Sequence, residues 1–138
     1  MSSDTEKLID TQVGGNYYQK LDPQPIEVIL RWRLPFCIGN VVKYLARYKF
    51  KNGIEDLKKA QQYLRFEMDM AHRSLSQKMS GYIPGPGHIR DNFKFIDTWK
   101  LSPHIKSAIF HIGRGNLELA GLAIELEIQL LEGCKEEK

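Results

Sequence analysis

A short turn, Lys49–Gly53, joins two helical patterns and constrains the fold more than any other feature of the chain. The first pattern runs from about Cys37 to Tyr48, and the second runs from about Ile54 to Gln77. Because the turn is so short, the two helices are expected to lie antiparallel and in contact, as a helical hairpin. The second helix carries a regular apolar stripe, formed by Leu57, Ala60, Leu64, Met68, Ala71 and Leu75.

A second hairpin is predicted in the C-terminal half of the chain. Ser102 is a good cap for a helix that starts at Pro103, and the turn Gly113–Asn116 follows that helix. A last helix is predicted over Leu117–Glu132, with Gly133 ending it.

Two shorter helices are predicted, Ile26–Arg33 and Ile89–Trp99, and no segment alternates with the period of a β-strand. A chain of 138 residues is long enough for one domain but not for two. The predicted fold is therefore all-α, with two packed helical hairpins and about five to six helices in a single small domain. Residues 1–15 are expected to form a flexible arm, residues 16–78 the first hairpin region, and residues 79–138 the second hairpin.

The composition indicates a cytoplasmic protein that binds small anions. No apolar run is long enough to span a membrane, and the polar N-terminus is not a secretory signal. Cys37 and Cys134 are expected to be reduced thiols, with no disulfide framework. The net charge is only +3, with the basic residues concentrated between Lys43 and Lys59, so the sequence favours a local anion site over binding to nucleic acid.

Polar side chains line up beside the apolar stripe of the first hairpin. They fall at helical spacing on two faces: Asn40, Lys43, Tyr44 and Arg47 on the first helix, and Asp56, Lys59 and Tyr63 on the second. Cations, an acid and phenols in one cluster can bind a small anion, and phosphate is the best candidate. Charged residues on helices more often form a solvated face, and that alternative stays open for each residue taken singly.

The familiar nucleotide and metal motifs are absent from the sequence. It has no phosphate-binding P-loop, no G-x-G-x-x-G turn and no protein-kinase signature. The four histidines are scattered, so no metal site is predicted. The acids of the last helix, Glu118, Glu125, Glu127 and Glu132, could contribute to a Mg²⁺ site, but the solvated face of that helix is the favoured assignment.

The first half of the chain resembles a known family. It reads Tyr-Tyr-Gln at Tyr17–Gln19, Pro-Ile-Glu-Val-Ile at Pro25–Ile29, and Gly-Asn-x-x-Lys-Tyr at Gly39–Tyr44. Arg and Lys follow, and then Asp-Leu-x-Lys-Ala and Tyr-Leu within Asp56–Leu64. Over roughly residues 16–65 this pattern is similar to the bacteriophage SaV-like family, in which some members are nucleotide kinases that lack a Walker motif. The early motif of that family has His where this chain has Tyr17.

The resemblance implies a phage nucleotide kinase, acting in the host cytoplasm, that converts deoxynucleoside monophosphates to diphosphates. The expected catalytic residues are Lys43, Arg47, Asp56 and Lys59. The expected substrate-binding residues are Tyr17, Tyr18, Asn40, Tyr44, Lys51 and Tyr63. In these assignments the cations neutralise phosphate, a tyrosine stacks on the base, and Asp56 orients a lysine or holds Mg²⁺. A nucleoside triphosphate is the expected phosphate donor; Mg²⁺ is compatible with the site, although no motif indicates it.

Other functions remain open at this stage. A non-catalytic protein that sequesters nucleotides fits the same cluster, and Tyr17 in place of His favours it slightly. An all-α nucleotide pyrophosphohydrolase is a further alternative, although the paired acidic motifs of those enzymes are missing. A nucleic-acid-binding accessory protein is the last alternative, and no recognition helix supports it.

A homo-oligomer is expected, because one cation-rich hairpin cannot surround a nucleotide. The apolar face of the last helix is equally suited to the core and to an interface; it consists of Leu117, Ala120, Ile124, Ile128 and Leu131.

Overall fold

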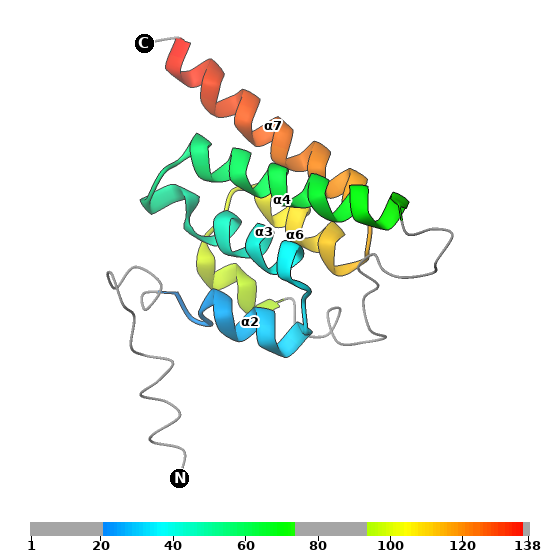
Figure 1. Ribbon diagram of the computed structural model, residues 1–138. Coiled ribbons are helices and arrows are strands. Elements are labelled where there is room, and N and C mark those ends of the chain that lie inside the picture. The colour runs from blue at the N-terminus through cyan, green and yellow to red at the C-terminus, as the bar shows by residue number, and fades with distance from the viewer. Residues whose placement is uncertain (1–20, 74–93, 137–138) are drawn as a thin grey trace.

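The computed structural model describes residues 21–73 and 94–136. Within these ranges the chain forms five α-helices, two short 3₁₀ helices and no strand, so the all-α prediction is confirmed (Figure 1). In chain order the elements are α2 (Pro25–Trp32), α3 (Phe36–Arg47), η2 (Tyr48–Phe50), α4 (Ile54–Arg73), η3 (Lys94–Trp99), α6 (Pro103–Gly113) and α7 (Leu117–Glu136). The arm predicted over residues 1–15 lies outside the described residues.

Both predicted hairpins are present, and they pack on each other (Figure 1). Helix α3 lies against α4, and α6 lies against α7. The two pairs meet where α4 contacts α7 and where α3 contacts α6. Helix α2 packs on α3 at the end of the molecule opposite α7. The first hairpin therefore has one face on the common core and another face toward solvent.

The turn of the first hairpin is tight and is held by a backbone hydrogen bond. Helix α3 ends at Arg47 and continues as the single 3₁₀ turn η2, and the Gly53 N–H donates to the Tyr48 carbonyl at 2.8 Å. Gly53 has a φ of 57°, a left-handed conformation that glycine adopts without strain. This tightening explains why α3 ends one residue before the predicted boundary. The predicted extension of α4 beyond Arg73 lies outside the described residues.

Helix α2 begins as its sequence signals indicate. Pro25 occupies the first turn, and the Gln24 N–H donates to Glu27 Oε2 at 2.6 Å as part of a capping box. Helix α2 also approaches α3 closely, because a Cβ added at Gly39 would lie only 3.2 Å from Ile29 Cγ2. The absence of a side chain at Gly39 thus sets the distance between these two helices.

The second hairpin starts as predicted but ends later. The Ile105 N–H donates to Ser102 Oγ at 3.3 Å, which caps α6 at its predicted start. The prediction that Gly133 ends the last helix is wrong, because α7 continues through Gly133 to Glu136. The helix predicted over Ile89–Trp99 is the 3₁₀ helix η3 where the structure describes it.

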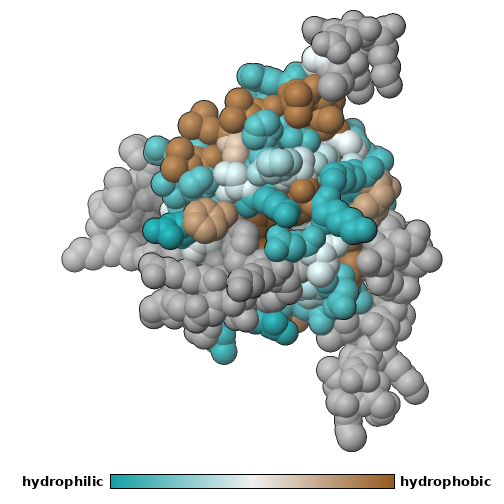
Figure 2. Space-filling view, turned by 180° about the vertical axis from the view of Figure 1, so that it is seen from behind, coloured by the Kyte–Doolittle hydropathy of each residue, from teal (hydrophilic) through white to brown (hydrophobic). Residues whose placement is uncertain are grey.

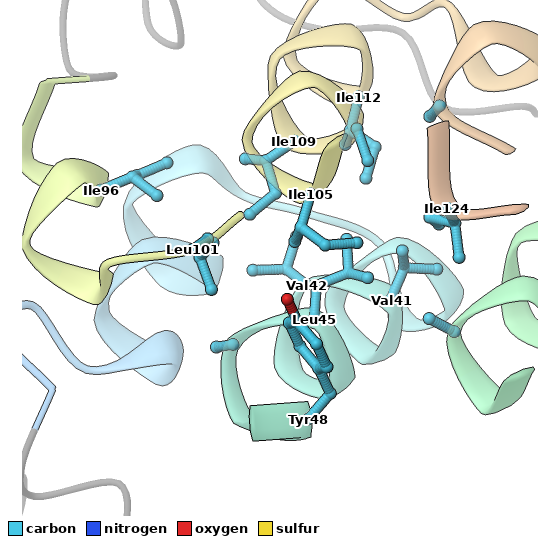
Figure 3. Packing of buried hydrophobic residues seen from close by; sticks show 14 of the residues in the cluster. Val41, Val42, Leu45, Tyr48, Ile96, Leu101, Ile105, Ile109, Ile112 and Ile124 are labelled. Atoms are coloured by element: carbon cyan, nitrogen blue, oxygen red, sulfur yellow. The ribbon is translucent and has the colours of Figure 1, made fainter. Parts of the chain in front are cut away.

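The core lies between α3, α4, α6 and α7, and Figure 3 shows part of it. The apolar face of the last helix belongs to this core, which settles the choice left open by the sequence. Ala120, Ile124 and Ile128 are buried, and Leu117 and Leu131 pack against them partly exposed. The side chains labelled in Figure 3 are Val41, Val42, Leu45, Tyr48, Ile96, Leu101, Ile105, Ile109, Ile112 and Ile124.

Glu127 corrects the expectation that all acids of the last helix are solvated. Its side chain is only 3% exposed. It accepts a hydrogen bond from the Tyr48 hydroxyl at 3.2 Å, and His104 Nδ1 lies 3.3 Å from its other oxygen. Both carboxylate oxygens therefore have partners, which a buried acid requires. Burial, as the main cause, raises the pKa of Tyr48 above its usual 10.0.

None of the helices within residues 21–73 and 94–136 is both long enough and apolar enough to cross a membrane.

Candidate functional site

Helices α3 and α4 bring three cations to the ring of Tyr44. Lys43 Nζ lies 4.5 Å from the ring centroid, Arg47 Cζ lies at 4.7 Å, and Lys59 Nζ lies at 5.7 Å. All three distances are within the range over which an aromatic ring attracts a cation. Lys43 directly precedes Tyr44 on α3 and Arg47 follows it by three residues, whereas Lys59 comes from α4. One ring therefore receives charge from its own helix and from α4. The structure thus brings together residues that the sequence placed on two separate helices.

Aromatic side chains continue this cluster along the hairpin. Tyr63 of α4 stacks on Tyr44, with ring centroids 5.9 Å apart and an interplanar angle of 20°. Phe36 and Phe66 contact Tyr63 edge-on, with centroids 6.1 and 5.8 Å away. Phe36 is 76% exposed and Phe66 is 48% exposed, so this apolar surface faces solvent.

The sequence analysis missed both phenylalanines, although a signal for them was present. Phe36 lies two helical turns before Tyr44, and Phe66 lies three residues after Tyr63. Side chains at these spacings share a helix face with the cluster. They were passed over because exposed phenylalanine is usually assigned to the core.

A buried carboxylate fixes Arg47. Asp56 has no solvent exposure, and it accepts from Arg47 Nε and Arg47 Nη2, each at 3.2 Å. It also accepts from the Asn52 N–H at 3.2 Å, so the same carboxylate ties Arg47 to the turn between the helices. The sequence analysis assigned Asp56 to orienting a lysine or holding Mg²⁺. In the structure its oxygens instead contact Arg47 and Asn52, and it positions an arginine.

Within the described residues, the two lysines of the cluster, Lys43 and Lys59, are not held by a buried carboxylate as Arg47 is. Lys59 Nζ lies 3.9 Å from Glu55 Oε2, and these side chains are 40% and 66% exposed. A pair this long and exposed contributes little, since water screens it. Lys43 has no carboxylate partner among the residues that the structure describes. Both lysines are therefore available to an anion that enters from solvent.

An open pocket of about 460 Å³ lies beside the cluster, along the N-terminal half of α4. Its lining consists of Asn52, Ile54, Glu55, Lys58, Lys59 and Gln62. Lys59 belongs to both the pocket and the group of cations around Tyr44. The pocket and the cluster are thus adjacent parts of one surface.

The remaining predicted substrate-binding residues either lie elsewhere on the first hairpin or fall outside the residues that the structure describes. Asn40 is one turn before Tyr44 on α3, and its Nδ2 donates to the Phe36 carbonyl at 3.1 Å. Lys51 is exposed on the turn between α3 and α4. Tyr17 and Tyr18 lie outside the described residues. In the parts of the chain that are described, no three His, Cys, Asp or Glu side chains are grouped so that they could hold a metal ion.

Together these features define an all-α, two-hairpin domain with a cation and aromatic cluster on one hairpin. Residues 14–65 match the model of a family described as a protein of unknown function, DUF3310. This segment contains α2, α3 and the first part of α4, and therefore all three cations around Tyr44. No curated protein and no solved structure matches the chain.

Proposed function

We propose that the protein is a nucleotide kinase of phage type that phosphorylates deoxynucleoside monophosphates to diphosphates at the Tyr44 cluster. The observation that carries the proposal is the convergence of Lys43, Arg47 and Lys59 on one ring from two helices. The resemblance to the SaV-like family and the match of residues 14–65 to a family of unknown function concern this same segment. The proposed place of action is the cytoplasm of the host.

The charge of the cluster supports a phosphate ligand. Like charges held close together repel one another, and a bound anion relieves that repulsion. Three cations and the buried Asp56 leave two positive charges. Glu55 lies 3.9 Å from Lys59 but is 66% exposed, so water screens its charge and a bound phosphate can displace it. A phosphate monoester carries a charge of about −2 at neutral pH, so it matches the cluster.

The aromatic side chains support a nucleoside attached to that phosphate. Phe36 and Phe66 present exposed ring surface next to Tyr63. Tyr63 stacks on Tyr44, which contacts the cations. An aromatic face binds a nucleobase of any identity by stacking. The arrangement therefore suits a mononucleotide, with its phosphate at the cations and its base on the rings.

The chemistry of phosphoryl transfer fits a site of this composition. Transfer depends mainly on alignment of the two substrates and on neutralisation of charge, and it needs little covalent chemistry from the protein. Lys43 and Lys59 would supply mobile positive charge, and Arg47 would supply charge held in place by Asp56. In this assignment Asp56 is a positioning residue, because it is buried and its oxygens bind Arg47 and Asn52.

The test is chromatographic product analysis. Purified protein is incubated with each deoxynucleoside monophosphate in turn and a nucleoside triphosphate, with Mg²⁺ or with chelator. Lys43→Ala is compared with Lys106→Ala on α6, because Lys106 is 43% exposed and lies away from the cluster. Formation of a diphosphate that is lost in Lys43→Ala and retained in Lys106→Ala is the expected result.

Three other results would contradict the proposal. Nucleotide binding without turnover in the wild type, lost in Lys43→Ala, would leave a sequestering protein as the function. Release of monophosphate and pyrophosphate from the triphosphate would identify a pyrophosphohydrolase. A diphosphate formed equally well by both variants would place the chemistry elsewhere on the chain.

The expected homo-oligomer remains part of the proposal, and α7 offers the surface for it. Apolar side chains gather along the edge of the molecule where α7 lies (Figure 2). Four leucines on this face are 42–61% exposed: Leu119, Leu122, Leu126 and Leu130. The spacing of three or four residues makes them a continuous stripe.

A second copy of the chain is the partner that this stripe suits, because the same apolar stripe on two copies can be buried together. On the side toward α4 the stripe is bordered by the acids Glu118 and Glu125, and Glu125 bonds to Gln61 of that helix. Two copies of α7 related by a twofold axis would bury the leucines of both stripes and leave these acids at the rim of the interface.

A further inference from the structure

Two groups of the first hairpin connect the Tyr44 cluster to the neighbouring pocket. Lys59 lies 5.7 Å from the centre of the Tyr44 ring and also lines the pocket. Asn52 lines the pocket and donates its N–H to Asp56, which in turn holds Arg47 over the same ring. A ligand in the pocket and a ligand on the cluster would therefore both contact Lys59, and the residues around both would depend on the buried Asp56.

We propose that this pocket binds the polyphosphate of the donor nucleoside triphosphate, as its Mg²⁺ complex, with Lys59 shared between donor and acceptor. The inference rests on the proposed kinase function and adds the position of the second substrate. It assigns Lys58, Glu55 and Gln62 to donor binding, and these residues have no role in acceptor binding. A volume of about 460 Å³ lies within the range of pockets that hold ligands of nucleotide size.

The lysines of the pocket are held only weakly by protein groups. Lys58 Nζ lies 3.6 Å from Glu132 Oε2, and these side chains are 59% and 46% exposed. The pair between Lys59 and Glu55 is longer still, at 3.9 Å. Exposed pairs of this kind exchange easily, whereas a polyphosphate offers several charges to both lysines at once.

Glu55 explains why the donor would enter with a metal ion. A carboxylate 66% exposed at the pocket repels a bare polyphosphate. Mg²⁺ is usually bound by one or two carboxylates together with substrate phosphates, and it retains several waters. A single exposed carboxylate beside two lysines fits that mode, and Mg²⁺ would supply neutralisation of the phosphate charge.

The placement allows a direct transfer. A phosphate oxygen of the acceptor forms a bond to the γ-phosphorus of the donor, while the bond from that phosphorus to the β,γ-bridging oxygen breaks. The electron pair stays on the departing diphosphate, and the acceptor becomes a diphosphate. The attacking oxygen is already ionised at neutral pH, so no general base is needed. Lys59, between the two ligands, would neutralise the charge on the group in transit.

The test measures binding separately for each ligand by calorimetry. A triphosphate analogue with a methylene group between the β- and γ-phosphorus serves as the donor probe, and deoxynucleoside monophosphates serve as acceptor probes. Because a lost charge-assisted contact corresponds to about tenfold in affinity, Lys58→Ala should weaken analogue binding about tenfold and leave monophosphate binding unchanged. Lys43→Ala should weaken monophosphate binding and leave analogue binding unchanged. Lys59→Ala should weaken the binding of both ligands. Lys106→Ala is the control, and circular dichroism confirms that each variant is folded.

A second variant tests the metal assignment without turnover. Glu55→Gln should abolish the difference between analogue binding with Mg²⁺ and analogue binding with chelator. Unchanged analogue binding in both Lys58→Ala and Glu55→Gln, with diphosphate still formed by the wild type, would overturn the inference and leave the kinase function standing. Analogue binding that depends on Lys58 without any diphosphate product would support the pocket and overturn the kinase function instead.

Discussion

Asp56 binds Arg47 through both of its carboxylate oxygens, from a position on α4 that has no solvent exposure. Arg47 is nearly as enclosed, with its side chain 12% exposed. The pair joins the last turn of α3 to the first turn of α4, so the geometry of the cation cluster depends on it. A charge pair enclosed to this degree is costly to break because one partner is left without compensation.

Replacement of Asp56 by asparagine should therefore destabilise the fold as well as the site. The asparagine side chain keeps the shape of the aspartate but leaves the arginine charge unpaired, and we expect the free energy of unfolding to fall by about 3 kcal/mol. Glu118→Gln is the matched control, because Glu118 is an exposed acid in the first turn of α7. Urea unfolding followed by circular dichroism gives both values. Equal effects of the two substitutions would contradict the structural role of Asp56.

Gly53 should be more sensitive to alanine than Gly133. A Cβ at either glycine meets no atom within 4 Å, so space does not distinguish them. Only Gly53 has a positive φ, of 57°, and alanine there should reduce stability by about 1 kcal/mol. Gly133 lies inside α7, where alanine should be neutral or stabilising by up to about 1 kcal/mol. Thermal unfolding of the two variants side by side provides the comparison, and an equal loss in both would refute this account.

The raised pKa of Tyr48 predicts a loss of stability at alkaline pH. Its pKa in the folded protein lies above 10.0, the usual value that applies in the unfolded chain, so its contribution is complete below pH 10. As the pH rises further, the unfolded chain releases the proton first, and unfolding becomes more favourable. The difference in unfolding free energy between wild type and Tyr48→Phe should therefore shrink as the pH rises above about 10. If the unfolding free energies of the two proteins change in parallel with pH, the pKa of Tyr48 is the same in the folded and unfolded chain, which would contradict this prediction.

Cys37 should react slowly with alkylating reagents at neutral pH. Burial is the main cause that raises its pKa above 9.0, and the charge of Glu67 raises it further. Only the thiolate reacts, so a raised pKa lowers the rate. In a Cys134→Ser background, iodoacetamide should modify Cys37 more slowly than a free thiol, and Glu67→Gln should increase the rate. A Glu67→Gln rate equal to that of the parent would exclude the electrostatic contribution.

Leu126 on α7 tests the proposed oligomer. Its side chain is 50% exposed at the centre of the leucine stripe, and a glutamate there would place charge in the interface. We expect Leu126→Glu to convert the assembly to monomers in size-exclusion chromatography with light scattering at several concentrations. Leu30→Glu is the control, because Leu30 is 67% exposed on α2. A wild type that is monomeric throughout, or a Leu126→Glu variant with unchanged mass, would remove α7 as the interface.

Local signals in the sequence predicted most of this fold. The proline in the first turn of α2, the cap at Ser102 and the turn before Ile54 depend on residues a few positions apart, so helix starts could be predicted to within one residue. The cation cluster was also predictable, because Lys43 and Arg47 occupy one helix face and the short turn fixes which face of α4 they meet.

The buried acids could not be predicted in the same way. Burial of Glu127 depends on its hydrogen-bond partner Tyr48, which lies 79 positions earlier in the chain. No pattern of neighbouring residues indicates a partner so far away. Asp56 reads as part of a charged face until the turn places Arg47 against it. Polar groups whose burial depends on a distant partner are thus the residues that the sequence alone misassigns.

The separation of nine positions between Arg47 and Asp56 also determines which contacts form first while the chain is being synthesised. A loop this short closes in about 10–100 ns, far faster than the ribosome adds one residue. The first hairpin can therefore bring its charged side chains together while the later helices are still being translated. The hydrogen bond between Tyr48 and Glu127 can form only after α7 has emerged, so a later segment of the chain stabilises a hairpin that an earlier segment has already formed.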